Sequence, residues 1–272
     1  MTRRWRRAAT ARSPSAGEHG LPDNARVHLL NADLHSHSTC SDGALAPAAL
    51  AARAQAQGVQ LWALTDHDTL DGLPQAREAA LDLGLGFLTG TEISVTFADE
   101  TVHVVGLGFD ARDADLVAGL AATRGGRLQR AREMAAGLAR AGIPGALDGA
   151  LAQVERPEAV SRMHFARFLV ERGVCADAHE VFRRFLVAGK PGHVPHRWAR
   201  LGDAVRWITG AGGMAVIAHP ARCRFDATLE YALFSEFTGH GGRGVEVLVG
   251  SHSEAERRHY GGIAGEFGLA AS

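Results

Sequence analysis

The chain has 272 residues, of which 46% are hydrophobic and 22% charged, and its formal net charge is −1 at pH 7. This length suits one large domain, or one domain that carries an insertion, and the composition is that of an ordinary globular protein. The near-neutral charge excludes a broad basic surface for nucleic acid, and no apolar run approaches the roughly 20 residues that span a bilayer.

Residues 1–27 are rich in arginine and lack hydrophobic periodicity. A transit peptide is one interpretation of such a start, and we favour a disordered basic extension outside the fold. The three cysteines, Cys40, Cys175 and Cys223, are scattered along the chain. Their small, odd number argues against a disulfide framework and predicts a reducing, cytoplasmic location.

Short apolar runs and helical segments then alternate. We expect strands at 27–34, 60–64 and 86–89 and helices at 47–57 and 73–83, each helix ending at a glycine. Residues 91–96 and 102–107 alternate as the two strands of a hairpin do. This order predicts a largely parallel α/β sheet or barrel over residues 28–112.

Strand patterns disappear from the middle of the chain. Helical periodicity covers 116–141, 157–172 and 178–187, so we predict a helical insertion or lid domain at 113–210. The barrel pattern resumes at 211–272, with strands at 214–218 and 244–249 and helices at 227–239 and 253–267. The last four residues resemble the opening of a further strand.

Side chains that bind metals stand at the ends of successive predicted strands. They are His35, His37, Asp42, His67, Glu92, His103 and His219. His35 and His37 are two residues apart, and such side chains share one face of an extended strand. A pair of surface histidines near a turn is the alternative, and the further ligands downstream count against it.

In parallel α/β folds the carboxyl ends of the strands meet at one edge, so these residues predict a site for several divalent ions. Zinc, iron and manganese all accept this set of nitrogen and oxygen ligands. Such a site indicates hydrolysis at phosphorus, because paired ions hold a hydroxide nucleophile and neutralise phosphoryl oxygens.

The ordered motifs resemble those of the PHP (polymerase and histidinol phosphatase) superfamily. They are His35-x-His37, Asp42, Thr65-Asp66-His67-Asp68, Glu92, His103 and Ala218-His219-Pro220. Residues 90–95, 161–167, 189–192 and 213–220 are similar to the bacterial branch of 3′,5′-nucleoside bisphosphate phosphatases, whose relatives include 5′-to-3′ exoribonucleases acting on short RNA.

The resemblance implies a distorted, TIM-like (β/α)7 barrel with a helical insertion and up to three divalent ions, usually Mn²⁺ in this branch. By motif, one ion takes His35, His37 and Glu92. A second shares Glu92 and takes His103 and His219, and a third takes Asp42 and His67. The catalytic members of this set are Glu92, His219 and Asp42.

The family pattern normally closes with Asp-x-His after the last strand, where this chain ends at Ser272. We expect that the sequence is truncated at its C-terminus. A complete but shortened protein is the alternative, and its first and third ion sites would lack a ligand each.

Basic side chains in the insertion suggest how substrate is held. We expect Arg162, His164, Lys190 and His196 to bind it, since guanidinium and ammonium groups suit phosphate. The predicted function is hydrolysis of the 3′-phosphate of nucleoside 3′,5′-bisphosphates, and 5′-to-3′ degradation of short 5′-phosphorylated RNA is a further expected activity. A small-metabolite phosphatase of the histidinol phosphate type and an inactive metal-binding or regulatory protein are alternatives.

Other residues receive structural interpretations. Asp66 and Asp68 flank His67 and are expected to orient it or to cap the following turn. Arg124, Arg127, Arg130 and Arg132 form a basic helix face that we favour as solvent-exposed, with an RNA track as the alternative. The expected partners are a nucleotide or short RNA, with no membrane and no obligate protein partner.

Overall fold

The computed structural model describes residues 30–272, so the expected basic extension at 1–27 lies outside the described residues. The predicted first strand lies partly outside them, and its described part forms β1 (Ala32–Asp33). Within the described part of the chain, no helix is both long and apolar enough to cross a membrane.

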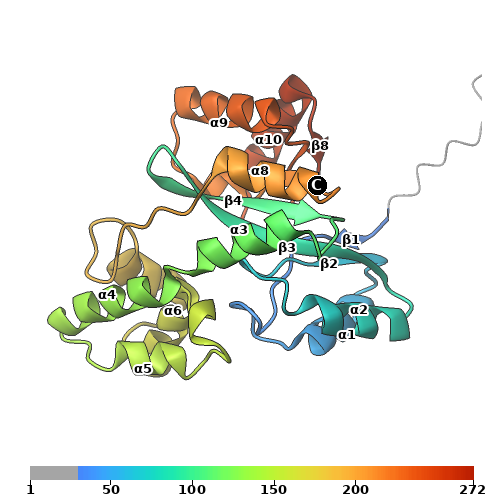
Figure 1. Cartoon of the computed structure of the whole chain (residues 1–272). Coiled ribbons are helices and arrows are strands. Elements are labelled where there is room, and N and C mark those ends of the chain that lie inside the picture. The colour runs from blue at the N-terminus through green and yellow to red at the C-terminus, as the bar shows by residue number, and fades with distance from the viewer. Residues whose placement is uncertain (1–29) are drawn as a thin grey trace, which may run out of the picture.

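A curled eight-stranded sheet forms the centre of the molecule (Figure 1). Its order is β1, β2 (Leu61–Leu64), β3 (Gly86–Phe97), β4 (Glu100–Leu107), β6 (Met214–Ile217), β7 (Gly244–Val245) and β8 (Ala270–Ala271), and β5 (Ala199–Arg200) pairs with β3. Neighbouring strands are parallel except where β4 meets β3 and β6. A curled, mostly parallel sheet with helices outside it confirms the predicted α/β class, a distorted TIM-like barrel.

The predicted third strand and the first strand of the predicted hairpin form one continuous strand, β3. Its first half pairs with β2 in parallel, and its second half pairs with β4 in antiparallel. The change of partner begins at Gly90, where a Cβ atom would lie 2.5 Å from the carbonyl oxygen of Leu64. Glycine therefore permits a close approach here, and the expectation of two separate strands was wrong.

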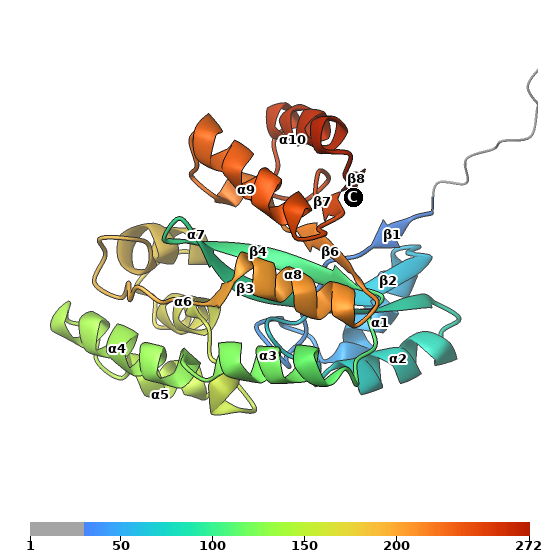
Figure 2. The same cartoon turned by 45° about the horizontal axis from the view of Figure 1, so that its top comes forward.

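Helices α1 (Pro47–Ala56), α2 (Leu73–Asp82), α9 (Ala227–Gly239) and α10 (Glu254–Phe267) lie where the sequence predicts helices. Helices α3 (Ala114–Arg124) and α8 (Leu201–Gly210) lie beside each other against the sheet (Figure 2). The largest fully buried side chains of the core between sheet and helices are Trp62, Leu64, Ile93, Leu116, Leu120, Phe234 and Phe237.

A second core lies among helices at one end of the sheet (Figure 1). These elements are α4 (Arg127–Arg140), α5 (Ala146–Leu151), η1 (Pro157–Ala159), α6 (Arg162–Glu171), α7 (Ala178–Val181) and the π-helical turn η2 (Phe182–Leu186). Their buried side chains include Met134, Leu138, Phe165, Leu169 and Leu186.

The expected single helix at 116–141 was wrong. Gly125 and Gly126 separate α3 from α4, and two adjacent glycines weaken a helix. The break lets each helix join a different core, since Leu116 and Leu120 belong to the sheet's core and Met134 to the second. We therefore propose that the independent helical unit is smaller than the expected 113–210, because α8 also packs on the sheet.

Candidate metal centre

The predicted ligands come from neighbouring strands of the sheet. His35 and His37 follow β1, His67 follows β2, and Glu92 lies within β3. His103 lies on β4 opposite Ser94 of β3, and His219 follows β6. Because β1, β2, β3, β4 and β6 are consecutive in the sheet, side chains far apart in sequence are brought to one place.

Glu92 is the centre of this arrangement and is 1% exposed. Its Oε2 lies 3.0 Å from His37 Nε2, 3.1 Å from His35 Nε2 and 3.2 Å from His67 Nδ1. Its Oε1 lies 2.7 Å from His219 Nε2 and 3.0 Å from His103 Nδ1. Five imidazoles thus converge on one buried carboxylate, which has about four lone-pair sites to offer them.

Two overlapping sets of ligand atoms are close enough to share an ion. One consists of His35, Glu92 and His219, and the other of His37, His67 and Glu92. Glu92 belongs to both sets, as the expected bridging role requires. The expected groupings are equally close. His35 Nε2 and His37 Nε2 lie 3.0 Å apart beside Glu92 Oε2, and His103 Nδ1 lies 3.4 Å from His219 Nε2 beside Glu92 Oε1. The allocation of individual ligands to ions therefore stays a prediction.

Asp42 lies at the edge of the cluster. Its carboxylate oxygens are 3.7 Å from His67 Nε2 and 3.9 Å from His37 Nδ1. Burial raises the pKa of Asp42, but His67 and His37 outweigh it and hold the pKa at about 2. An ionised carboxylate therefore faces the outer side of these two imidazoles.

The protonation of the imidazoles differs within the cluster. Burial lowers the pKa of His35, yet Glu92 and Glu246 raise it to about 10. Burial, with the neighbouring His37 and His103, lowers the pKa of His67 to about 3 despite the nearby carboxylates. His67 is therefore neutral and presents a lone pair, which is the form that binds a metal ion.

The donor set fits divalent cations. Among the described residues the buried Nδ1 of His67 finds no hydrogen-bond partner, because its 3.2 Å approach to Glu92 lacks hydrogen-bond geometry. His35 Nε2 and His37 Nε2 also face each other at 3.0 Å. Imidazole nitrogens crowded around a buried carboxylate, one of them without a hydrogen-bond partner, form a donor set that a bound cation satisfies.

Glu246 is a member of the site that the sequence analysis missed. It is 4% exposed, and its Oε1 lies 2.5 Å from Nδ1 of His35. Its Oε2 accepts the backbone N–H of His219 at 2.6 Å. His219 has a φ of 27° ahead of Pro220, so this contact holds a backbone conformation that is rare for residues other than glycine.

A carboxylate that takes the second ring nitrogen of a histidine fixes its tautomer and directs the other nitrogen to the metal. Glu246 escaped attention because it lies just past β7, inside the longer strand predicted at 244–249. The available signal was a single acidic residue in the apolar run from Val245 to Val249.

The aspartates that flank His67 are buried and hold neighbouring segments. Asp66 accepts hydrogen bonds from the backbone N–H and hydroxyl of Ser38 and from the hydroxyl of Ser41. Asp68 is 0% exposed and accepts from the N–H and hydroxyl of Ser94. It also forms an ion pair with Arg127 of α4.

The residues expected to bind substrate occupy different environments. Arg162 is half-buried beside Phe182, and His196 packs against Trp198. Lys190 is exposed on its loop. His164 is 1% exposed, and its Nδ1 accepts the backbone N–H of Ser161 in the cap of α6, so its burial supports a structural role instead.

Comparisons with known proteins identify the family of this chain. The family model described as the PHP domain matches residues 33–152. The chain is 50% identical over 244 residues to a 3′,5′-nucleoside bisphosphate phosphatase of Chromobacterium violaceum, covering 90% of this chain and 86% of the relative. It is 40% identical over 242 residues to the 5′-3′ exoribonuclease Rnm of Escherichia coli, covering 88% of this chain and 82% of the relative.

A solved structure is also similar to this chain. It is an amidohydrolase from Chromobacterium violaceum with bound sulfate and no metal. The two share 51% identity and a TM-score of 0.87, covering 89% of this chain and 85% of the other.

Proposed function

The chain belongs to the PHP family of phosphoester hydrolases, and from that premise we propose that it removes the 3′-phosphate from nucleoside 3′,5′-bisphosphates. The observation that carries this proposal is the convergence of five imidazoles on Glu92 beside a cluster of arginines from the helical unit. The relative that shares 50% identity is a phosphatase of this substrate class.

We propose that Glu92 and the histidines around it hold up to three divalent ions, with Mn²⁺ as the resident metal. Bound divalent ions supply a hydroxide nucleophile near neutral pH and neutralise the phosphoryl oxygens. Glu92 would bridge two ions, because it belongs to both ligand sets, and Asp42 would offer an ionised oxygen next to His67. Glu92, Asp42 and His219 are thereby the proposed catalytic members.

A second phosphate needs positive charge away from the metal centre. Burial and the nearby guanidinium groups of Arg162 and Arg127 lower the pKa of Arg130 to about 9. Arg162 is close enough to Asp42 to respond to its charge. Guanidinium groups that are crowded together and partly buried are stabilised by a dianion, so we assign Arg130 and Arg162 to the 5′-phosphate.

His196 and Lys190 are proposed to complete the substrate contacts. His196 lies beside this arginine cluster. Burial lowers the pKa of His196 most, and the charges of Arg130 and Arg127 lower it further. Lys190 is exposed on the loop that leads towards His193 and His196, where an ammonium group can reach a bound phosphate. His164 is the weakest of the four expected contacts because it is buried in the α6 cap.

Degradation of short 5′-phosphorylated RNA is a second candidate activity. The 40% identity to an exoribonuclease favours it, and the same arginines suit a terminal 5′-phosphate. A histidinol phosphate phosphatase fits less well, because a substrate with one phosphate leaves the arginine cluster without an anion. An inactive metal-binding protein would show no turnover on any phosphoester.

Phosphate release from adenosine 3′,5′-bisphosphate with added Mn²⁺ tests the proposal. We expect turnover on this substrate, and none on histidinol phosphate. In the Arg162→Met variant KM for the bisphosphate should rise about 10- to 100-fold, because a charged hydrogen bond contributes about 1.5–3 kcal/mol.

Adenosine 3′-monophosphate is the matched control, since it lacks the 5′-phosphate. Its KM should be the same in the wild type and in Arg162→Met. An equal rise in KM for both substrates would contradict the assignment of Arg162 to the second phosphate. Faster turnover of histidinol phosphate than of the bisphosphate would contradict the proposed function itself.

A further inference from the structure

Two serines that precede Asp42 bind its loop to the barrel. Ser38 and Ser41 donate to Asp66 at 2.6–2.7 Å. Gly43 closes the turn, and a Cβ atom there would lie 1.9 Å from the carbonyl oxygen of His37. Asp42 itself accepts its hydrogen bonds from elsewhere.

Helix α6 of the helical unit provides those contacts. The hydroxyl of Ser161, the N-cap residue, donates to Asp42 Oδ2 at 3.2 Å. The guanidinium of Arg167 donates to the carbonyl oxygen of Asp42 at 2.5 Å and to that of Gly43 at 3.4 Å. The backbone and the carboxylate of Asp42 are thus both held by one helix.

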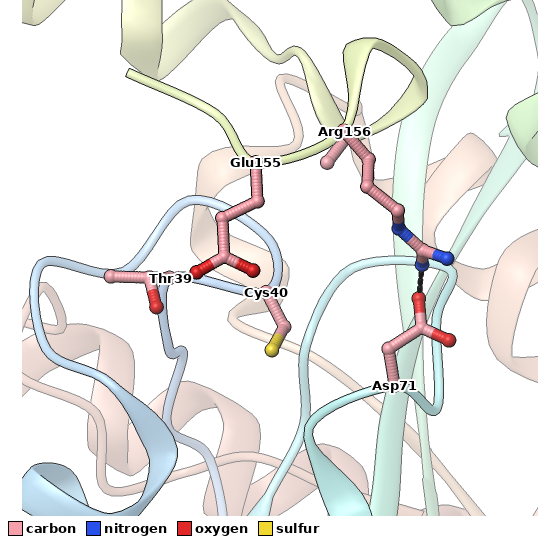
Figure 3. A pocket seen from close by; sticks show the side chains of 6 residues that line it. Thr39, Cys40, Asp71, Glu155 and Arg156 are labelled. Atoms are coloured by element: carbon pink, nitrogen blue, oxygen red, sulfur yellow. Dashed lines mark ion pairs between the residues drawn. The ribbon is translucent and has the colours of Figure 1, made fainter.

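The helix that holds Asp42 is itself firmly placed. Phe165 and Leu169 bury their side chains in the second core, and the Ser161–His164 capping box fixes the first turn. Close to this loop the helical unit touches the barrel again. Figure 3 shows Glu155 and Arg156 facing Thr39 and Cys40 across a small cavity, with Arg156 paired to Asp71 of the barrel.

We propose that Arg167 is a positioning residue for cation binding, which fixes the Asp42 backbone so that its carboxylate stands beside His67. The helical unit then forms part of the metal centre as well as part of the substrate site. This inference rests on the proposed cation site, but it is independent of which phosphoester is hydrolysed.

The physical reason is the geometry of a short side chain. An aspartate has two side-chain torsions, so the position of its carboxylate follows the position of its backbone closely. Loss of the Arg167 contacts frees the tip of the loop, while Asp66 still holds Ser38 and Ser41. Removing such outer contacts to metal ligands costs about 10- to 100-fold in metal affinity.

Metal affinity measured without substrate tests the inference. The full chain is stripped of metal and dialysed against Mn²⁺ buffered over a wide range of free concentrations, and bound metal is counted by mass spectrometry. One ion should bind about 10- to 100-fold more weakly in Arg167→Met than in the wild type, while at least one other ion is unchanged. Arg132→Met, a loss of the same charge from an exposed position of α4, is the matched control and should bind metal as the wild type does.

The Asp42→Asn variant shows whether Arg167 acts through Asp42. It should weaken the same ion, and the double variant should be no worse than Asp42→Asn alone. The inference is overturned if Arg167→Met binds every ion as tightly as the wild type, or if the two changes add. A uniform loss of all ions with a lower melting temperature of the metal-free protein would also overturn it, since Arg167 would then only support folding.

Discussion

At the scale of single residues, the buried carboxylate of Glu246 allows a more specific prediction than the histidines that it contacts. Its two oxygens accept from two different donors, the ring of His35 and the backbone N–H of His219. An amide in its place offers only one acceptor, so one of these donors would face an NH₂ group.

We therefore predict that Glu246→Gln weakens metal binding about 10- to 100-fold while the protein still folds. The measurement is metal content after equilibrium dialysis, with circular dichroism as the check on folding. Glu236→Gln, an exposed change on α9, is the control. Wild-type affinity in Glu246→Gln would mean that the carboxylate does not orient His35.

The seven predicted ligands and Glu246 differ in how visible they are to sequence reasoning. A histidine or acid directly after an apolar run stands out, and parallel strands bring such positions together. Glu246 could be recognised only from the end of β7 at Val245, and that end depends on the strands that pair with β7. The division of histidines between ions depends on distances of a few ångströms, which spacing in sequence does not encode.

At the scale of elements, the ion pair between Asp68 and Arg127 joins the loop after β2 to the first turn of α4. Both side chains are buried, at 0% and 7% exposure. Arg124, from the end of α3, also donates to the carbonyl oxygen of Asp68. This loop carries His67, so the α3–α4 junction lies against the proposed metal centre.

Removing one partner of a buried ion pair leaves an uncompensated charge. We predict that Arg127→Met lowers the free energy of unfolding by about 3–5 kcal/mol, measured by urea denaturation. Arg258→Met breaks an exposed pair with Glu254 on α10 and should cost less than about 1 kcal/mol. Equal losses in the two variants would show that the buried pair is not special.

Hydrophobic periodicity and helix-breaking residues predicted most helices and strands correctly. They did not predict where neighbouring elements join or separate. The predicted 227–239 helix coincides with α9, since Asp226 caps its first turn. The same residue type has opposite effects at two places. Gly90 lets strand β3 continue past a close contact, whereas Gly125 and Gly126 end helix α3. Only packing against distant residues distinguishes these cases.

At the scale of the whole molecule, the proposed metal centre joins parts of the chain that are distant in sequence. His35 and Glu92 belong to the first barrel segment and His219 to the second, with the helical unit between them. Ligands shared in this way stabilise the folded state, because the unfolded chain does not assemble the site.

We therefore predict that Mn²⁺ stabilises the native protein against urea. When the free Mn²⁺ concentration is 100 times the dissociation constant of a site, binding adds about 2.7 kcal/mol to the free energy of unfolding. A chelator should remove this contribution. Glu92→Gln is the test of origin, because it removes the bridging ligand from both sets. The stability of Glu92→Gln should be independent of Mn²⁺, because a neutral amide replaces the carboxylate that both ligand sets share. If Glu92→Gln still gains as much stability from Mn²⁺ as the wild type, the metal binds at a different place, and the strands do not assemble the proposed centre.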